Sequence, residues 1–128
     1  MSTVMIADEH TENRALMTDL CRAAGYDVTI GTSTATVMVG LLKRTCKVVL
    51  LGSQFDELEA VELIPLLKRC CKTLPIIVVA SDFPAAATRR LRREGIFYHL
   101  LRPVLPEDFE ELQQAIACAL KKQAPCYN

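Results

Sequence analysis

The sequence has no tryptophan, few aromatic residues (5%) and no net charge, because 15 lysines and arginines balance 15 aspartates and glutamates. This balance removes the broad positive field with which proteins hold nucleic acid, so we expect no nucleic-acid binding by this domain. The sequence also lacks a secretory leader and any run of about 18 apolar residues, the least that spans a membrane. We therefore expect a cytoplasmic protein without a membrane partner.

Metal-binding and disulfide motifs are missing as well. Six cysteines are present, but none of them form a C-x-x-C pair, and the chain has only two histidines. These residues lack the spacing of a zinc site. Since 51% of the residues are hydrophobic, a core can form without disulfides, and we expect reduced thiols. A strained bond between Cys70 and Cys71 is the less favoured alternative.

The apolar residues that are present gather in five short runs, each of which predicts a β-strand. The longest runs lack polar alternation, which is typical of strands buried on both faces of a parallel sheet. The runs span residues 3–7, 28–30, 47–51, 75–80 and 96–101.

Amphipathic segments follow these runs and predict helices. The first ends at Gly25, and the clearest starts at Pro106 with an acidic first turn and ends at Lys122. The remaining helices are expected at 34–44, 59–72 and 84–94. Five alternations of strand and helix predict an α/β fold, a doubly wound parallel sheet with helices on both faces. We expect one domain over residues 1–122, with 123–128 as a tail or the start of a linker.

Several short motifs resemble response-regulator receiver domains in their order and spacing. The resemblance covers about residues 3–122 and implies the flavodoxin-like (βα)5 fold with strand order 2-1-3-4-5. It also implies a role in two-component, or phosphorelay, signal transduction. The motifs are Asp8-Glu9, Asn13-Arg14, Gly25-Tyr26-Asp27-Val28, Leu74 through Val79, and Arg102-Pro103.

The resemblance also implies where phosphoryl chemistry would take place. In that family an acid pair after the first strand helps to bind Mg²⁺. An aspartate at the end of the third strand accepts a phosphoryl group from a histidine kinase. Asp8 and Glu9 match the acid pair, but Gly52 stands at the phosphoacceptor position and offers no nucleophile. Asp8 and Glu9 alone would be weak ligands for Mg²⁺, and we expect no bound metal.

Two further positions of the family's pocket differ in this chain. Receivers carry a serine or threonine at the end of the fourth strand and a lysine before the proline that follows the fifth. Ala80 stands at the hydroxyl position, with Ser81 one step later, and Arg102 precedes Pro103. Arginine keeps the positive charge but replaces a compact ammonium with a planar fork. We expect this guanidinium to pair with the acid pair across an emptied pocket.

These differences lead to the hypothesis of a pseudo-receiver. It would be phosphorylation-incompetent, would be no enzyme, would need no cofactor, and would regulate by contact with a signalling protein or a fused output domain. The alternative is a functional receiver, switched by atypical phosphorylation or by a small ligand in the pocket. Asp56, which lies in an expected polar loop over residues 53–57, is an example of an atypical phosphorylation site. A flavodoxin-like enzyme is less favoured, because no glycine-rich phosphate loop follows the first strand.

Two surface features are candidates for switching and binding. His99 occupies a position where receivers often carry a rotating aromatic, so it is either a pH-sensitive switch or a half-buried histidine with a local hydrogen bond. The fourth helix is rich in arginine, which is typical either of a solvated face or of a protein interface. A homodimer through the fourth helix, fifth strand and fifth helix is one option. The expected contact residues are Arg89, Arg90, Arg93, Phe97 and Tyr98.

Overall fold

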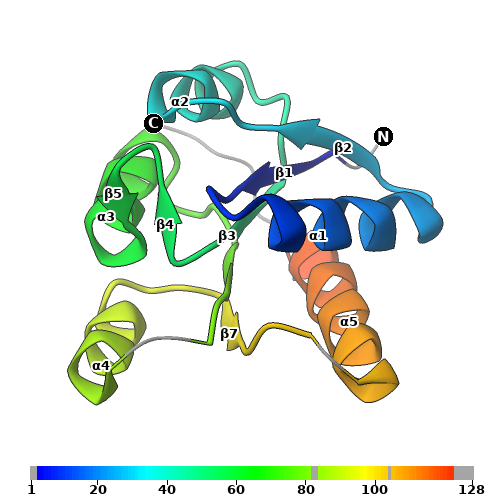
Figure 1. The fold of residues 1–128 in the computed structure, drawn as a ribbon. Coiled ribbons are helices and arrows are strands. Elements are labelled where there is room, and N and C mark those ends of the chain that lie inside the picture. Colours follow the sequence, from blue (N-terminus) through cyan, green and yellow to red (C-terminus); the bar gives the residue numbers. More distant parts are fainter. Residues whose placement is uncertain (1–2, 82–83, 104, 123–128) are drawn as a thin grey trace.

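The computed structural model describes residues 3–81, 84–103 and 105–122, and over these residues it contains one five-stranded parallel sheet. Its order is β2-β1-β3-β6-β7 (Figure 1), which is the predicted 2-1-3-4-5 when the main strands are counted alone. The predicted doubly wound α/β fold is therefore confirmed. The tail expected at 123–128 lies outside the described residues. The strands are β1 (Thr3–Ala7), β2 (Asp27–Ile30), β3 (Val48–Leu51), β6 (Ile76–Val79) and β7 (Tyr98–Leu100).

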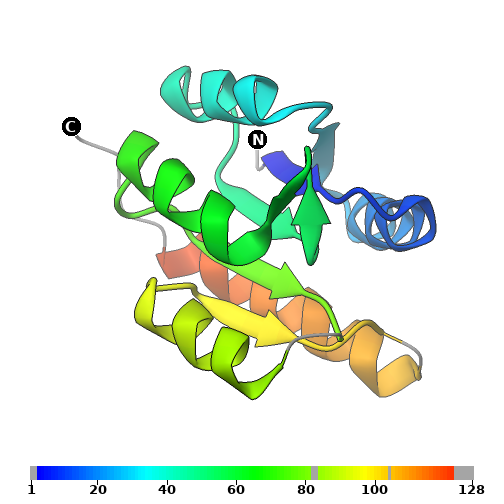
Figure 2. The ribbon, with the colours of Figure 1, turned by 60° about the vertical axis from the view of Figure 1, so that its left-hand side comes forward.

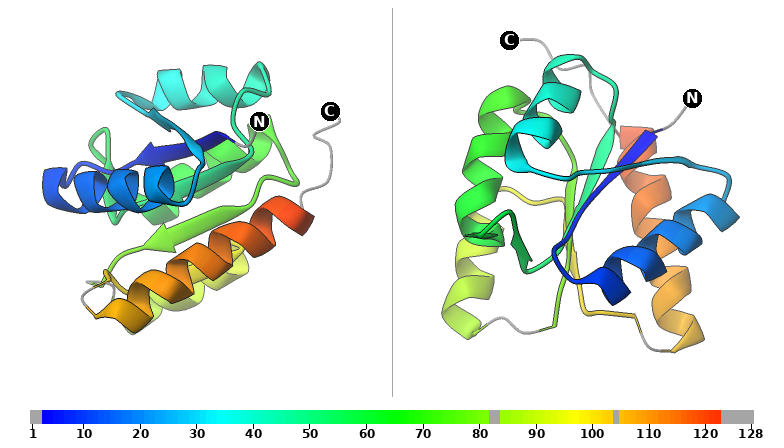
Figure 3. Two further views of the ribbon diagram at one scale, coloured as in Figure 1. Left: turned by 90° about the vertical axis from the view of Figure 1, so that its right-hand side faces the viewer. Right: turned by 45° about the horizontal axis from the view of Figure 1, so that its top comes forward.

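Helices cover both faces of this sheet. The right-hand view of Figure 3 shows the sheet between α3 and α4 on one side and α1 and α5 on the other. Helix α2, at the top of Figure 2, packs on the same face as α3 and α4, since Val37 and Leu41 share one core cluster with them. The helices are α1 (Thr11–Ala23), α2 (Thr34–Leu42), α3 (Ala60–Cys70), α4 (Ala85–Arg93) and α5 (Pro106–Lys122). Among the described residues, no helix is both long and apolar enough to cross a membrane.

The sheet divides the core into two apolar clusters. Successive side chains of β1 point to opposite faces, so Met5 packs with α2 and α3 while Ile6 packs with α1 and α5. Every residue of β3 and β6 is buried. This two-sided burial is the reason why these runs show no polar alternation.

A short hairpin follows β3, where the sequence indicated only a polar loop. Its strands are β4 (Gln54–Phe55) and β5 (Leu58–Glu59), which pair antiparallel. Asp56 and Glu57 form the turn with φ angles of 53° and 65°, which is a left-handed conformation. Phe55 anchors the hairpin in the core. The loop interpretation was therefore wrong for Gln54 and Phe55, whereas Asp56 and Glu57 do form an exposed turn.

The cysteines differ in state. Cys21, Cys46 and Cys118 are free thiols, whereas Cys71 is disulfide-bonded. The expectation of reduced thiols is therefore wrong for Cys71. Burial raises the pKa of Cys21 to about 11 and that of Cys46 to about 12. These two thiols stay protonated and unreactive near neutral pH.

Candidate functional site

Asp8 lies at the carboxyl end of the sheet, directly after β1, and only 1% of its surface is exposed. The backbone N–H of His10 donates to its Oδ1 at 2.9 Å. The Nδ2 of Asn13, on α1, donates to its Oδ2. Asn13 is itself only 2% exposed. Because both carboxylate oxygens accept hydrogen bonds from fixed donors, Asp8 is held in one orientation.

Gly52 follows β3 and lies against this carboxylate. Its backbone N–H donates to the carbonyl oxygen of Ala7 at 3.0 Å, which ties the ends of β3 and β1 together. A Cβ built on Gly52 would fall well inside van der Waals contact with all three carboxyl-group atoms of Asp8. The sequence suggested an empty pocket around Gly52, but the structure shows that this space is occupied. The side chain of Asp8 fills it.

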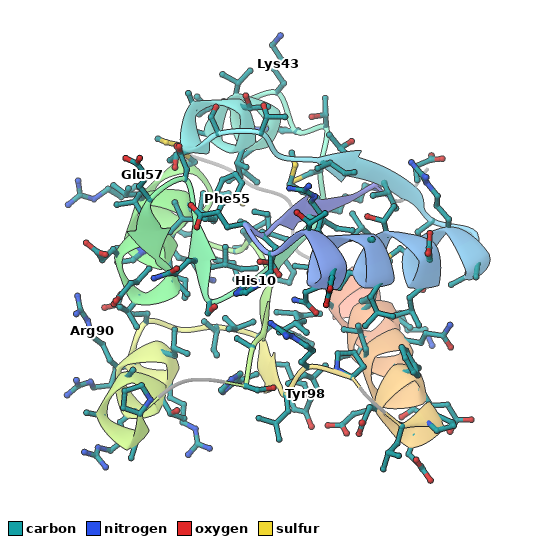
Figure 4. The ribbon with its side chains drawn as sticks, viewed as in Figure 1. His10, Lys43, Phe55, Glu57, Arg90 and Tyr98 are labelled. Atoms are coloured by element: carbon teal, nitrogen blue, oxygen red, sulfur yellow. The ribbon has the colours of Figure 1, made fainter. Side chains whose placement is uncertain are left out.

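Glu9, the second acid of the pair, binds the hairpin. Its backbone N–H donates to the carbonyl oxygen of Gln54, and its Oε1 accepts from the backbone N–H of Glu57, both at 3.0 Å. Figure 4 labels His10 at the start of α1 and Phe55 and Glu57 on the hairpin, on either side of this connection. The acid pair thus splits, with one carboxylate in the pocket and the other joining two loops.

The Mg²⁺ that the fold family implies does not fit these residues. Mg²⁺ needs a near-octahedral set of free oxygen ligands. Both oxygens of Asp8 and one of Glu9 already accept hydrogen bonds from the protein, and position 52 supplies no third carboxylate. No group of three or more metal-ligating side chains occurs within the part of the chain that the structure describes.

Asp56 lies at the tip of the hairpin and contacts α2. Its Oδ2 accepts from the backbone N–H of Thr34, the first residue of α2, at 2.7 Å. This bond lowers the pKa of Asp56, because it favours the charged carboxylate at the positive end of a helix. Between the hairpin and the sheet lies an open groove of about 680 Å³, lined by Asp8, Glu9, Arg14, Ile30, Gly31, Thr32, Phe55, Asp56 and Glu57.

Asp56→Asn is expected to remove a pH-dependent part of the stability. Since folding lowers the pKa of Asp56, its carboxylate stabilises the fold above its unfolded pKa, about 4. This contribution disappears as the pH falls through the folded value. Urea unfolding should show the variant to be less stable than wild type at neutral pH and equal to it in acid. Glu57→Gln is the matched control, and an equal pH-dependent difference there would contradict the assignment.

Arg102 does not pair with the acid pair, contrary to our expectation. Among the described residues, no ion pair joins its guanidinium to Asp8 or Glu9, and its buried Nε has no hydrogen-bond partner. The reason is that both oxygens of Asp8 are already occupied by other donors. The arginine that reaches Asp8 is Arg14, whose Nη1 donates to the Asp8 backbone oxygen at 3.4 Å. The Asn13-Arg14 motif was visible in the sequence, but we did not assign it to the pocket.

Two hydrogen bonds between a side chain and the backbone join residues after β6 to residues in and after β7. The Oγ of Ser81 accepts from the backbone N–H of Arg102 at 2.8 Å. Ala80 and Pro103 are buried. The half-buried His99 donates from Nε2 to the Ala80 carbonyl oxygen at 3.0 Å. This is the local hydrogen bond of the plainer alternative for His99.

The expected interface residues are accessible but spread over two elements. Arg89, Arg90 and Arg93 are exposed on α4. Tyr98 is 44% exposed on β7. Figure 4 shows Arg90 on the outer side of α4 and Tyr98 beside β7, the edge strand of the sheet. A groove of about 430 Å³ lies between β7 and α5, lined by Phe97, Tyr98, Glu111, Gln114, Ala115 and Cys118.

Comparisons with known proteins agree with this geometry. Residues 4–117 match the family model of the response regulator receiver domain. The chain is 24% identical over 119 residues to the DNA-binding transcriptional regulator NtrC of Rhizobium meliloti (strain 1021). This match covers 93% of the chain but only 24% of NtrC, so the chain spans about a quarter of the length of that relative.

Solved structures of low sequence identity share the fold. A receiver domain protein from Clostridium thermocellum has a TM-score of 0.81 at 16% identity, over 95% of this chain and 96% of that one. The CheY-like receiver protein of Methanospirillum hungatei JF-1 has a TM-score of 0.79 at 16% identity, over 95% and 98%. The receiver domain of a modulated diguanylate cyclase from Desulfovibrio desulfuricans G20 has a TM-score of 0.79 at 22% identity, over 95% of both chains.

Proposed function

Because this chain belongs to the response regulator receiver domain family, we propose that it is a receiver that accepts no phosphoryl group and regulates through protein contacts. The observation that carries this proposal is the position of Asp8, whose carboxylate fills the space of a side chain at Gly52. If only the acid at position 52 were missing, a single substitution could restore it. Because Asp8 fills the space beside Gly52, a new side chain there also requires Asp8 to move.

The chemistry of phosphoryl transfer supports the same conclusion. A carboxylate attacks phosphorus only where nearby cations compensate its charge and that of the incoming oxygens. Asp8 is the remaining buried acid of this pocket, but it is 1% exposed and both of its oxygens accept hydrogen bonds. Asp56 is exposed and binds the start of α2. Neither carboxylate has the accessible, cation-lined setting that the reaction needs.

Incubation with acetyl phosphate and Mg²⁺, or with beryllofluoride, is expected to leave the protein unchanged. Intact-mass measurement should show no phosphoryl adduct, and heteronuclear NMR spectra should show no shifts around Gly52. A receiver with the full set of pocket residues, treated in parallel, is the positive control. A stoichiometric adduct that disappears in Asp56→Asn would overturn the proposal in favour of atypical phosphorylation.

We further propose that the face formed by α4, β7 and α5 binds a protein partner. Three exposed arginines and the exposed ring of Tyr98 support this, since arginine and tyrosine are enriched in interface hot spots. The partner is a signalling protein or an output domain of the same polypeptide. The second possibility is supported by the match to NtrC, a DNA-binding regulator of which the matched part is only 24%. The receiver itself contributes no catalysis and needs no cofactor in this proposal.

A further inference from the structure

Helix α2 is apolar on two opposite faces. None of its nine residues is charged. Val37, Gly40 and Leu41 face the core and are buried. The outward side carries a second apolar stripe, with Val39 47% exposed and Leu42 62% exposed.

This outward stripe has the spacing of a packing surface. Ala35, Val39 and Leu42 are related as i, i+4 and i+7, so they lie on one side of the helix, and all three are exposed. A helix that is hydrophobic all round is normally buried. Figure 1 shows that α2 lies at the edge of the molecule, with the rest of the fold on one side of it. The composition of α2 therefore indicates that a further surface covers the stripe.

The two ends of α2 carry opposite charges. At its start lies the hairpin turn, where Asp56 binds Thr34 and Glu57 is exposed. Beyond its end lie the exposed side chains of Lys43 and Lys47. Figure 4 shows Lys43 projecting above α2 and Glu57 on the hairpin side. The nine residues of the helix span about 13 Å, so the acidic and the basic group are close enough to belong to one interface.

We propose that the outward stripe of α2 binds the same stripe on a second copy of this chain. A two-fold axis near Val39 would place the two helices antiparallel, so that each apolar stripe packs against its equivalent. The same axis would bring the Lys43 end of each copy to the Glu57 end of the other. A surface that is complementary to itself in this way is what a two-fold dimer requires. The small side chains of Ala35 and Thr36 let the helices approach closely.

The apolar contact is tested by sedimentation velocity of the full chain over a concentration series. Wild type is expected to show a reversible monomer–dimer equilibrium, which is weak because the apolar stripe is small. The double variant V39S/L42S should weaken dimerisation by more than about tenfold, since each substitution occurs twice across a two-fold interface. Leu105→Ser is the matched control, because it removes an exposed apolar side chain outside α2, and it should leave the equilibrium unchanged. Tyr98→Ser tests self-association through the face formed by α4, β7 and α5, and it should not disrupt the dimer.

The charge contact is tested by exchanging the charges. Lys43→Glu and Glu57→Lys should each weaken the dimer, and their combination should restore it towards the wild-type dissociation constant. Circular dichroism establishes that each variant is folded. Three outcomes overturn the proposal: a monomer at every concentration, a dimer that survives V39S/L42S, or one that Tyr98→Ser disrupts. The last of these would place self-association on the α4, β7 and α5 face instead.

Discussion

Gly52→Ala is expected to lower the free energy of unfolding by about 1–3 kcal/mol, because the new methyl group overlaps the carboxylate of Asp8. The direction is informative, since alanine normally stabilises a protein relative to glycine where the backbone conformation permits it. Gly52 is not among the glycines with a positive φ. A loss of stability in Gly52→Ala would therefore come from overlap with Asp8 and not from backbone strain. Urea unfolding of the two proteins measures the difference.

A double-mutant cycle with Asp8→Ala isolates this overlap. Once the carboxylate is removed, Gly52→Ala should cost much less than in wild type, so the two substitutions should be coupled by at least about 1 kcal/mol. Additive costs would contradict our assignment. The same overlap predicts that Gly52→Asp alone does not restore phosphorylation at rates typical of the family. The new side chain must first displace Asp8 from Asn13.

Asn13→Ala is expected to destabilise the protein by about 1.5–3 kcal/mol, the range for hydrogen bonds to charged groups. Asn13 donates to the buried carboxylate of Asp8, and its loss leaves one carboxylate oxygen without that donor. Asn13→Asp should cost more at neutral pH, since it places a second carboxylate against the first. This extra cost should shrink in acid, where carboxylates become protonated. Chemical unfolding at two pH values measures both effects.

Glu12→Ala is the control for the Asn13 variants. Glu12 is the preceding residue of α1 but is exposed, and its loss should change stability by no more than about 0.5 kcal/mol. A cost for Asn13→Ala that persists unchanged in the Asp8→Ala background would show that Asn13 acts through some other contact. The carbonyl oxygen of Val79, 3.4 Å from its Nδ2, would then be the first candidate.

The main strands were predictable because burial leaves a clear pattern in the sequence. A strand buried on both faces must be apolar at every position, and β3 and β6 are. The hairpin was not predictable, since its strands have two residues each and its turn contains no glycine. Asp56 and Glu57 take left-handed conformations there, which Phe55 in the core and the bonds to Thr34 and Glu9 hold in place.

In the pocket, too, the positions of the residues were predictable from the sequence, but their side-chain contacts were not. The predicted strands and the family resemblance placed Asp8, Gly52 and Arg102 at the carboxyl ends of three strands of one parallel sheet. It did not show which donor would reach the carboxylate, because this depends on where each side chain points. Arg102 was the expected partner, but Asn13 on α1 binds Asp8.

The sequence by itself determined the fold, through the periodicity of its apolar residues, and the lack of a side chain at position 52. Only the tertiary structure decided what occupies the resulting space. The carboxylate of Asp8 fills it because α1 brings the Asn13 amide to one of its oxygens and the loop brings the His10 backbone N–H to the other. These donors are fixed by the packing of α1 on the sheet, which spacing along the chain does not describe.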